Sequence, residues 1–105
     1  MGDKCQWLAE FLRDGSEAAF QRLVEQHVDL VYFTAMRMVN GDTHSAEDIT
    51  QLVFSDLAKN AHSLPADVVL AGWLHRDTRF TALEWLRKER RRVERETEAT
   101  TMHEG

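Results

Sequence analysis

A set of polar residues near the middle of the chain could bind a partner through hydrogen bonds. Asp48 and Gln51 lie three positions apart and Ser55 follows four positions later, so all three share one face of a helix. That face lies away from the apolar stripe of the same segment and should be exposed. Ser45 and Asp48 also fit a variant of the capping box, in which the acid serves only the helix start. The spacing alone therefore allows a capping motif or a protein-binding face.

A second set forms a basic and aromatic stripe toward the C-terminus, with members four or three positions apart: Arg76, Phe80, Leu83, Arg87 and Arg91. Guanidinium groups bind phosphates, and an aromatic ring can stack on an unpaired base. Further basic residues flank the stripe: Arg79, Lys88, Arg90, Arg92 and Arg95. A solvated helix end is the alternative, because the helix dipole favours cations there. That alternative does not explain Arg76 and Arg79 near the helix start, where the dipole favours acids.

Residues for catalysis or for cofactor binding are not apparent. The sequence contains no glycine-rich phosphate loop, no Ser/His/Asp order and no Cys/His pairing. Its five histidines lack metal-ligand spacing, and His44 with Glu47 is explained more simply by a helix start. We therefore expect a protein that is not an enzyme and that needs neither a metal nor a cofactor.

The elements that must position these residues are helices. One proline and five glycines in 105 residues disfavour strands and turns, and runs rich in Ala, Leu, Glu and Arg favour helix. Gly15 and Gly41 mark helix ends, and Ser16 is a good N-cap. We expect an all-α fold, a compact bundle of three long helices plus a short N-terminal one. The expected helices cover residues 4–13, 16–39, 43 or 45 to 60, and 68 or 71 to 95, with a loop at 61–67.

Helical spacing also predicts which side chains form the core. The second helix should bury one stripe and the third another: Phe20, Leu23, Val24, His27, Val31, Ala35 and Met38, then Ile49, Leu52, Val53 and Leu57. We expect Trp85 in the core as well. Residues 96–105 have Met102 as their one large apolar side chain and should not fold alone. The predicted division is therefore a helical domain at 1–95 and the start of a polar linker at 96–105.

Charge is distributed unevenly along the chain. The net charge is −5, but residues 1–70 carry 5 basic against 11 acidic side chains, and residues 71–95 carry 8 against 4. A basic segment on an acidic body predicts one face for DNA and another for protein, with weak DNA affinity for the domain alone. The single cysteine excludes an internal disulfide, and no apolar run is long enough for a membrane span. We expect a cytoplasmic protein without membrane contact.

Three segments resemble the promoter-melting domain, region 2, of the extracytoplasmic-function (ECF) bacterial sigma factors. Residues 46–54 look like the Asp-x-x-Gln helix of that family. Residues 17–24 and 29–37 look like its first long helix, and residues 72–76 and 82–87 look like its promoter-reading helix. The segments occur in the family's order and cover roughly residues 15–95.

The resemblance implies a transcription initiation factor that binds core RNA polymerase and melts the promoter −10 element. It places Glu47, Asp48, Gln51 and Ser55 against the clamp helices of the polymerase β′ subunit. Docking by Asp48 is compatible with its capping role, so we expect both. It places loop and helix residues on the single-stranded −10 non-template strand: His62, Ser63, Leu64, Trp73, Arg76, Arg79, Phe80, Arg87, Arg90 and Arg91. An anti-sigma factor is a further candidate partner, and the family's second domain, which reads the −35 element, would follow residue 105.

The chain departs from the family at positions that bear on base preference. Leu64-Pro65-Ala66 stands where the family often has Phe-Arg-Gly in the loop that takes a flipped-out base. Phe80 replaces a frequent Asn, and Asp77 stands where an apolar or small residue is usual. The preferred −10 base therefore cannot be transferred from the family. The competing hypothesis is a helical protein-interaction module, such as a partner-sequestering regulator, that does not bind DNA.

Overall fold

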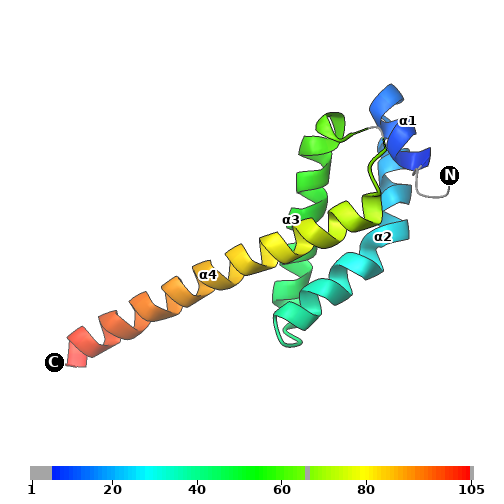
Figure 1. Ribbon diagram of the computed structural model, residues 1–105. Helices are drawn as coiled ribbons and strands as arrows, with labels where there is room; N and C mark the ends of the chain where they lie inside the picture. The colour runs from blue at the N-terminus through cyan, green and yellow to red at the C-terminus, as the bar shows by residue number, and fades with distance from the viewer. Residues whose placement is uncertain (1–5, 66, 105) are drawn as a thin grey trace.

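The computed structural model describes residues 6–65 and 67–104, and of residues 100–104 only the backbone. It contains α1 (Gln6–Asp14), α2 (Glu17–Met38), α3 (Thr43–Asn60) and α4 (Leu70–Glu104), with a single 3₁₀ turn, η1 (Ala61–Ser63), after α3 (Figure 1). No strand occurs in the described part of the chain. This confirms the predicted all-α bundle of one short and three long helices. The expected start of the first helix at Lys4 lies outside the described residues.

Local sequence sets the boundary between α1 and α2. Gly15 has φ of 64°, and its amide donates to the Phe11 carbonyl at 2.8 Å. This is the left-handed conformation in which glycine is least strained. Ser16 then caps α2, its hydroxyl accepting from the Ala19 amide at 3.1 Å. Both roles were predicted from the sequence and are confirmed.

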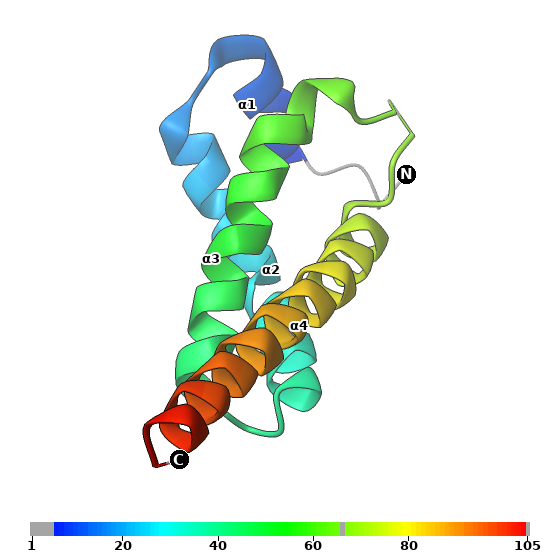
Figure 2. The same cartoon turned by 90° about the vertical axis from the view of Figure 1, so that its left-hand side faces the viewer.

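The turn between α2 and α3 is also built from left-handed residues. Asn40 has φ of 54° and Gly41 has φ of 82°, and the Gly41 amide donates to the Met36 carbonyl at 2.9 Å. Two consecutive left-handed residues reverse the chain within a few positions, so that α3 packs back along α2 (Figure 2).

The core lies where α2, α3 and the first half of α4 meet. The largest side chains with almost no exposure come from all three helices: Leu23, Val31, Ile49, Val53, Leu57, Leu70, Leu74 and Thr78. The predicted stripe of α2 is confirmed at Leu23, Val31 and Ala35. The predicted stripe of α3 is wrong at Leu52, which is 45% exposed. Leu52 lies at the edge of the α3–α4 contact rather than beneath it.

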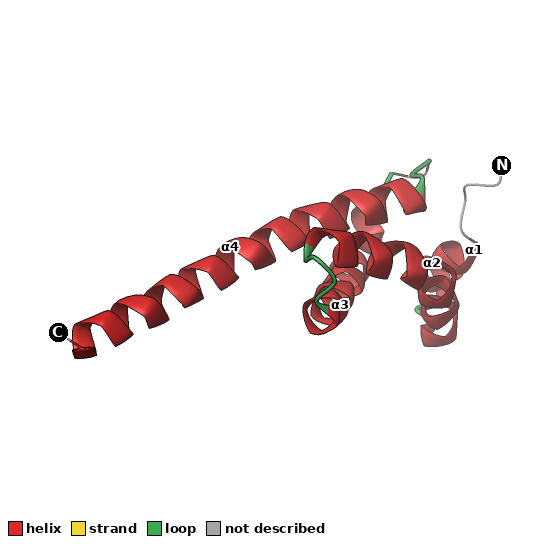
Figure 3. Cartoon of the chain, turned by 90° about the horizontal axis from the view of Figure 1, so that it is seen from below, coloured by secondary structure: helices red, strands yellow, loops and turns green. Residues whose placement is uncertain are grey.

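The second half of α4 leaves the bundle and projects as a single helix, giving the molecule extents of 63 × 23 × 22 Å (Figure 3). The prediction that this helix ends at Arg95 is wrong, because α4 continues to Glu104. Residues 90–99 are indeed all exposed. A helix that is already nucleated can nevertheless extend without burial, and ion pairs three and four positions apart support it. None of the described helices, α4 included, is long and apolar enough to cross a membrane.

Candidate functional site

Asp48 lies in the second turn of α3, not at its cap. The N-cap is Asp42, whose carboxylate accepts from the Ser45 amide at 3.3 Å and from the Ser45 hydroxyl at 2.8 Å. These hydrogen bonds hold the pKa of Asp42 below its ordinary value. Ser45 is buried in the first turn. The predicted capping box of Ser45 with Asp48 is therefore wrong, because an earlier acid already satisfies the free amide.

The polar face of α3 is open to solvent. Glu47, Gln51 and Ser55 are exposed, and Asp48 is partly so. Asp48 contacts His44, whose Nε2 lies 3.6 Å from its carboxylate. An exposed pair of this kind contributes little to stability. With no capping role, Asp48 and its neighbours form a polar surface that the fold does not require.

The basic stripe of α4 lies on one exposed face of the helix. All five members, Arg76, Phe80, Leu83, Arg87 and Arg91, are exposed, with Phe80 at 63% and Leu83 at 52%. Arg79 and Arg90 beside the stripe are exposed too. Because most of the Phe80 side chain is exposed, the fold buries little of its apolar surface, and the ring is accessible to a ligand.

The arginines of the projecting segment differ in what they contact. Arg92 pairs with Glu89 at 2.9 Å and with Glu96 at 2.7 Å, and these two acids raise its pKa. Arg87, Arg90 and Arg91 form no ion pair within the described part of the chain. Arg87, Arg90 and Arg91 are thus available to an external anion, whereas Arg92 forms ion pairs within α4.

The loop between α3 and α4 exposes some of its predicted contact residues. His62 and Ser63 are exposed in η1, whereas Leu64 is half-buried and packs against the core. Pro65 is exposed, and Ala66 lies outside the described residues. Leu64 therefore fixes the loop to the core, while His62 and Ser63 remain accessible to a ligand.

The two tryptophans of α4 both pack against the core from partly buried positions. Trp73 also lines a small hollow with Arg76, Asp77 and Phe80. It thus lies at the edge of the exposed stripe, and its contact with DNA stays a prediction. Trp85 is partly buried and lines the groove between α3 and α4, so its expected place in the core is met in part.

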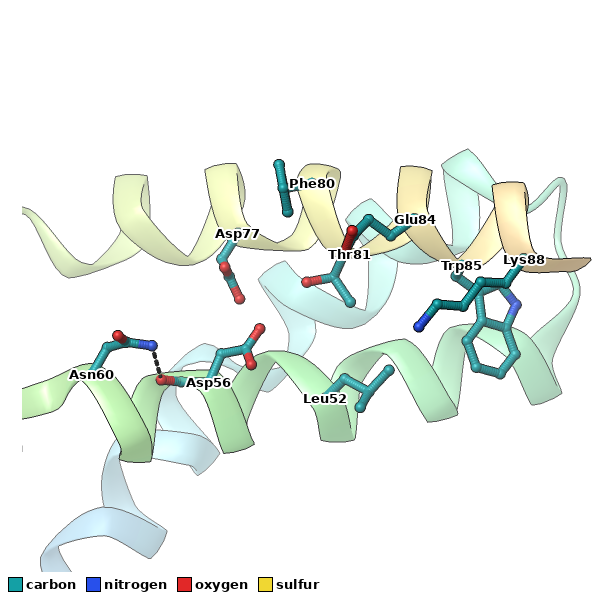
Figure 4. A pocket seen from close by; sticks show the side chains of 9 residues that line it. All are labelled: Leu52, Asp56, Asn60, Asp77, Phe80, Thr81, Glu84, Trp85 and Lys88. Carbon is teal, nitrogen blue, oxygen red and sulfur yellow. Dashed lines mark hydrogen bonds between the residues drawn. The ribbon is translucent and has the colours of Figure 1, made fainter.

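Two acids, Asp56 and Asp77, come together although sequence reasoning assigned no role to Asp56 and left the role of Asp77 open. Both line a groove of about 400 Å³ between α3 and α4, and their carboxyl groups point toward each other (Figure 4). Burial, followed by a hydrogen bond to Asp56 and the charge of Asp56, raises the pKa of Asp77 to about 7. The signal present in the sequence was an acid at position 77, in a helix that otherwise buries apolar and small residues there.

A polar face on α3, a basic aromatic face on α4 and an all-helical body define a helical binding module. The family model of sigma-70 region 2 matches residues 23–92, which is most of the chain and includes both faces. The chain belongs to this family, and it is a transcription initiation domain that serves promoter recognition and binds core RNA polymerase and promoter DNA. Comparison with the curated proteins and with the solved structures gave no significant match.

Proposed function

We propose that the chain is region 2 of an ECF-type sigma factor, a cytoplasmic protein that docks on the β′ clamp helices and captures the melted −10 strand. The proposal rests on three motifs in the family's order, at residues 17–37, 46–54 and 72–87. It is supported by membership of the sigma-70 region 2 family.

In this proposal α3 supplies the polymerase contact. Asp48 and Gln51 are its central residues, with Glu47 and Ser55 beside them. The support is that these side chains reach solvent on one helix and have no structural duty in the cap. A carboxylate and an amide on adjacent turns can accept and donate hydrogen bonds to a partner helix.

The DNA contact is assigned to α4 and the loop before it. Arg87, Arg90 and Arg91 would hold phosphates, while Phe80 and Trp73 would stack on bases of the single strand. His62, Ser63 and Leu64 would border a flipped-out base, and Arg76 and Arg79 would hold the backbone near it.

The mechanism is differential binding. Unpaired bases become accessible to Phe80 and the loop only after the duplex opens, so binding shifts the equilibrium toward the open form. No chemical step and no cofactor is required. The observation that carries this proposal is Phe80, a largely exposed aromatic ring within a row of arginines.

The test uses the whole chain. Core RNA polymerase is pulled down with it, and the complex is titrated with a labelled −10 non-template strand and with the matching duplex at two salt concentrations. We expect binding to core, preference for the single strand and weaker binding at higher salt. Binding to core with no DNA preference would favour the protein-interaction module. Failure to bind core would contradict the proposal as a whole.

A further inference from the structure

Asp56 and Asp77 face each other from α3 and α4 across the groove of Figure 4. Apolar side chains line the groove beside them: Leu52, Phe80 and Trp85. Asp77 is partly buried, and its Oδ2 is a buried atom without a hydrogen-bond donor within the described residues. The group that it faces is another carboxylate, which has no hydrogen to donate unless one of the two is protonated.

The charges around the pair do not neutralise it. From α4, Glu84 and Lys88 line the same groove, and Arg76 lines the adjoining hollow. Neither cation, Lys88 nor Arg76, forms an ion pair with Asp56 or Asp77 within the described residues. From α3, the Asn60 amide donates to the backbone carbonyl of Asp56 at 2.8 Å. No described residue of α1 or α2 lines either hollow.

Two facing carboxylates in a partly desolvated groove repel each other, and one proton held between them replaces the repulsion with a hydrogen bond. The direction of the pKa shift at Asp77 agrees, because burial and Asp56 both favour its neutral form. The contact between α3 and α4 therefore differs between the two protonation states.

We propose that Asp56 and Asp77 form a proton-dependent latch, closed by a shared proton and opened by its loss, which controls how closely α4 packs on α3. Asp77 stands one turn before Phe80 and next to Arg76, so opening displaces the exposed stripe of α4 relative to α3. The consequence for DNA rests on the proposed function, since these two helices are the ones assigned to promoter and polymerase. The latch itself does not depend on that function.

The latch is tested on the whole chain by following the aspartate carboxyl carbons by NMR between pH 5 and 8.5. The wild-type chain should show one carboxyl titrating at about pH 7. Asp77→Asn should remove that titration, and Asp56→Asn should move the Asp77 midpoint down toward its ordinary value of 3.8. Glu84→Gln, which removes an acid of the same groove outside the pair, should leave it in place.

Opening of the latch is measured by the NMR signals of the α3 and α4 backbone amides and of the Trp85 indole, recorded in the same titration. We expect signals near Leu52, Asp77 and Trp85 to shift with the carboxyl midpoint in wild type and to stay constant in Asp77→Asn. A carboxyl that titrates while these signals do not respond overturns the latch, because the proton would then bind without moving the helices. Ordinary midpoints for both acids overturn it as well.

A separate arm links the latch to DNA. Affinity for the single-stranded −10 oligonucleotide is compared at pH 6 and pH 8 in wild type, Asp77→Asn and Glu84→Gln. A change of pH that acts outside the latch affects all three proteins alike. The latch therefore appears as a larger loss of affinity at pH 8 in wild type and Glu84→Gln than in Asp77→Asn. Equal losses in all three overturn its control of DNA binding. Absence of DNA binding at both pH values contradicts the proposed function, while the NMR titration still decides the latch.

Discussion

Asp42 and Ser45 hold the start of α3 together by two hydrogen bonds to one carboxylate, 3.3 Å from the Ser45 amide and 2.8 Å from its hydroxyl. The helix carrying the polar face is thus fixed from its N-terminus by residues outside that face. Asp42 caps the helix, whereas Asp48 and Gln51 are assigned to partner binding, so separate substitutions can test stability and binding independently.

Replacing Asp42 by Ala should lower the thermal unfolding midpoint at neutral pH, because the first turn of α3 loses its cap. The pKa of Asp42 in the folded state is lowered from 3.8. The cap therefore contributes to stability fully above pH 3.8, and this contribution is lost as the pH falls through the lower pKa of the folded state. The difference between wild type and Asp42→Ala should therefore shrink below about pH 4. Circular dichroism melts from pH 2.5 to 7 measure this; a difference independent of pH would contradict the capping role.

The double substitution Asp48→Ala with Gln51→Ala should weaken binding to core RNA polymerase without unfolding the domain. The change in free energy of unfolding should stay below about 1 kcal/mol, since the contact of Asp48 with His44 is exposed. Asp29→Ala, which removes an acid of α2, is the matched control. Equal core affinity in the double variant and the control would reject docking through this face.

Arg91→Ala and Arg92→Ala should differ in the salt dependence of single-strand binding. Removing a cation that binds one phosphate should reduce the slope of log affinity against log salt by about 0.7. We expect that reduction for Arg91, which has no ion pair within the described chain, and a smaller one for Arg92, which Glu89 and Glu96 already partly neutralise. Identical slopes in the two variants would mean that these ion pairs do not restrict access to phosphate.

Phe80→Asn should change which −10 base is preferred while leaving the salt slope unaltered, because a stacking ring is replaced by a hydrogen-bonding amide. Stability should change little, as Phe80 is 63% exposed. Leu83→Asn, one turn along the same face, is the control for loss of apolar surface. Competition among single-stranded −10 variants provides the measurement, and a preference altered equally by both substitutions would argue against a specific role for the ring.

Asp77→Asn should change how stability depends on pH. The folded-state pKa of Asp77 is raised from 3.8 to about 7, so its favourable contribution is complete below 3.8 and is lost as pH rises toward 7. The variant keeps a neutral side chain throughout, and its unfolding midpoint should exceed that of wild type more at pH 8 than at pH 5. Parallel melting curves across this range would show that Asp77 ionises without cost to the fold.

The sequence by itself determined the features that depend on neighbours along the chain. Gly15 and Ser16 end one helix and begin the next through conformational preference and a side-chain cap, both local effects. Apolar residues at helical spacing within each segment predicted the burial of Leu23 and Val31 in α2 and of Ile49 in α3, because a helix repeats every 3.6 residues. The same periodicity placed Arg76, Phe80, Leu83, Arg87 and Arg91 on one face of a helix, and the structure shows that this face is exposed.

Tertiary structure decided what depends on how helices cross. Leu52 has the spacing of a core residue, yet it is exposed because α4 passes beside it rather than over it. Asp56 and Asp77 are 21 positions apart in the chain. They face each other because the packing of α3 against α4 fixes their distance, and no local preference of either residue encodes that distance.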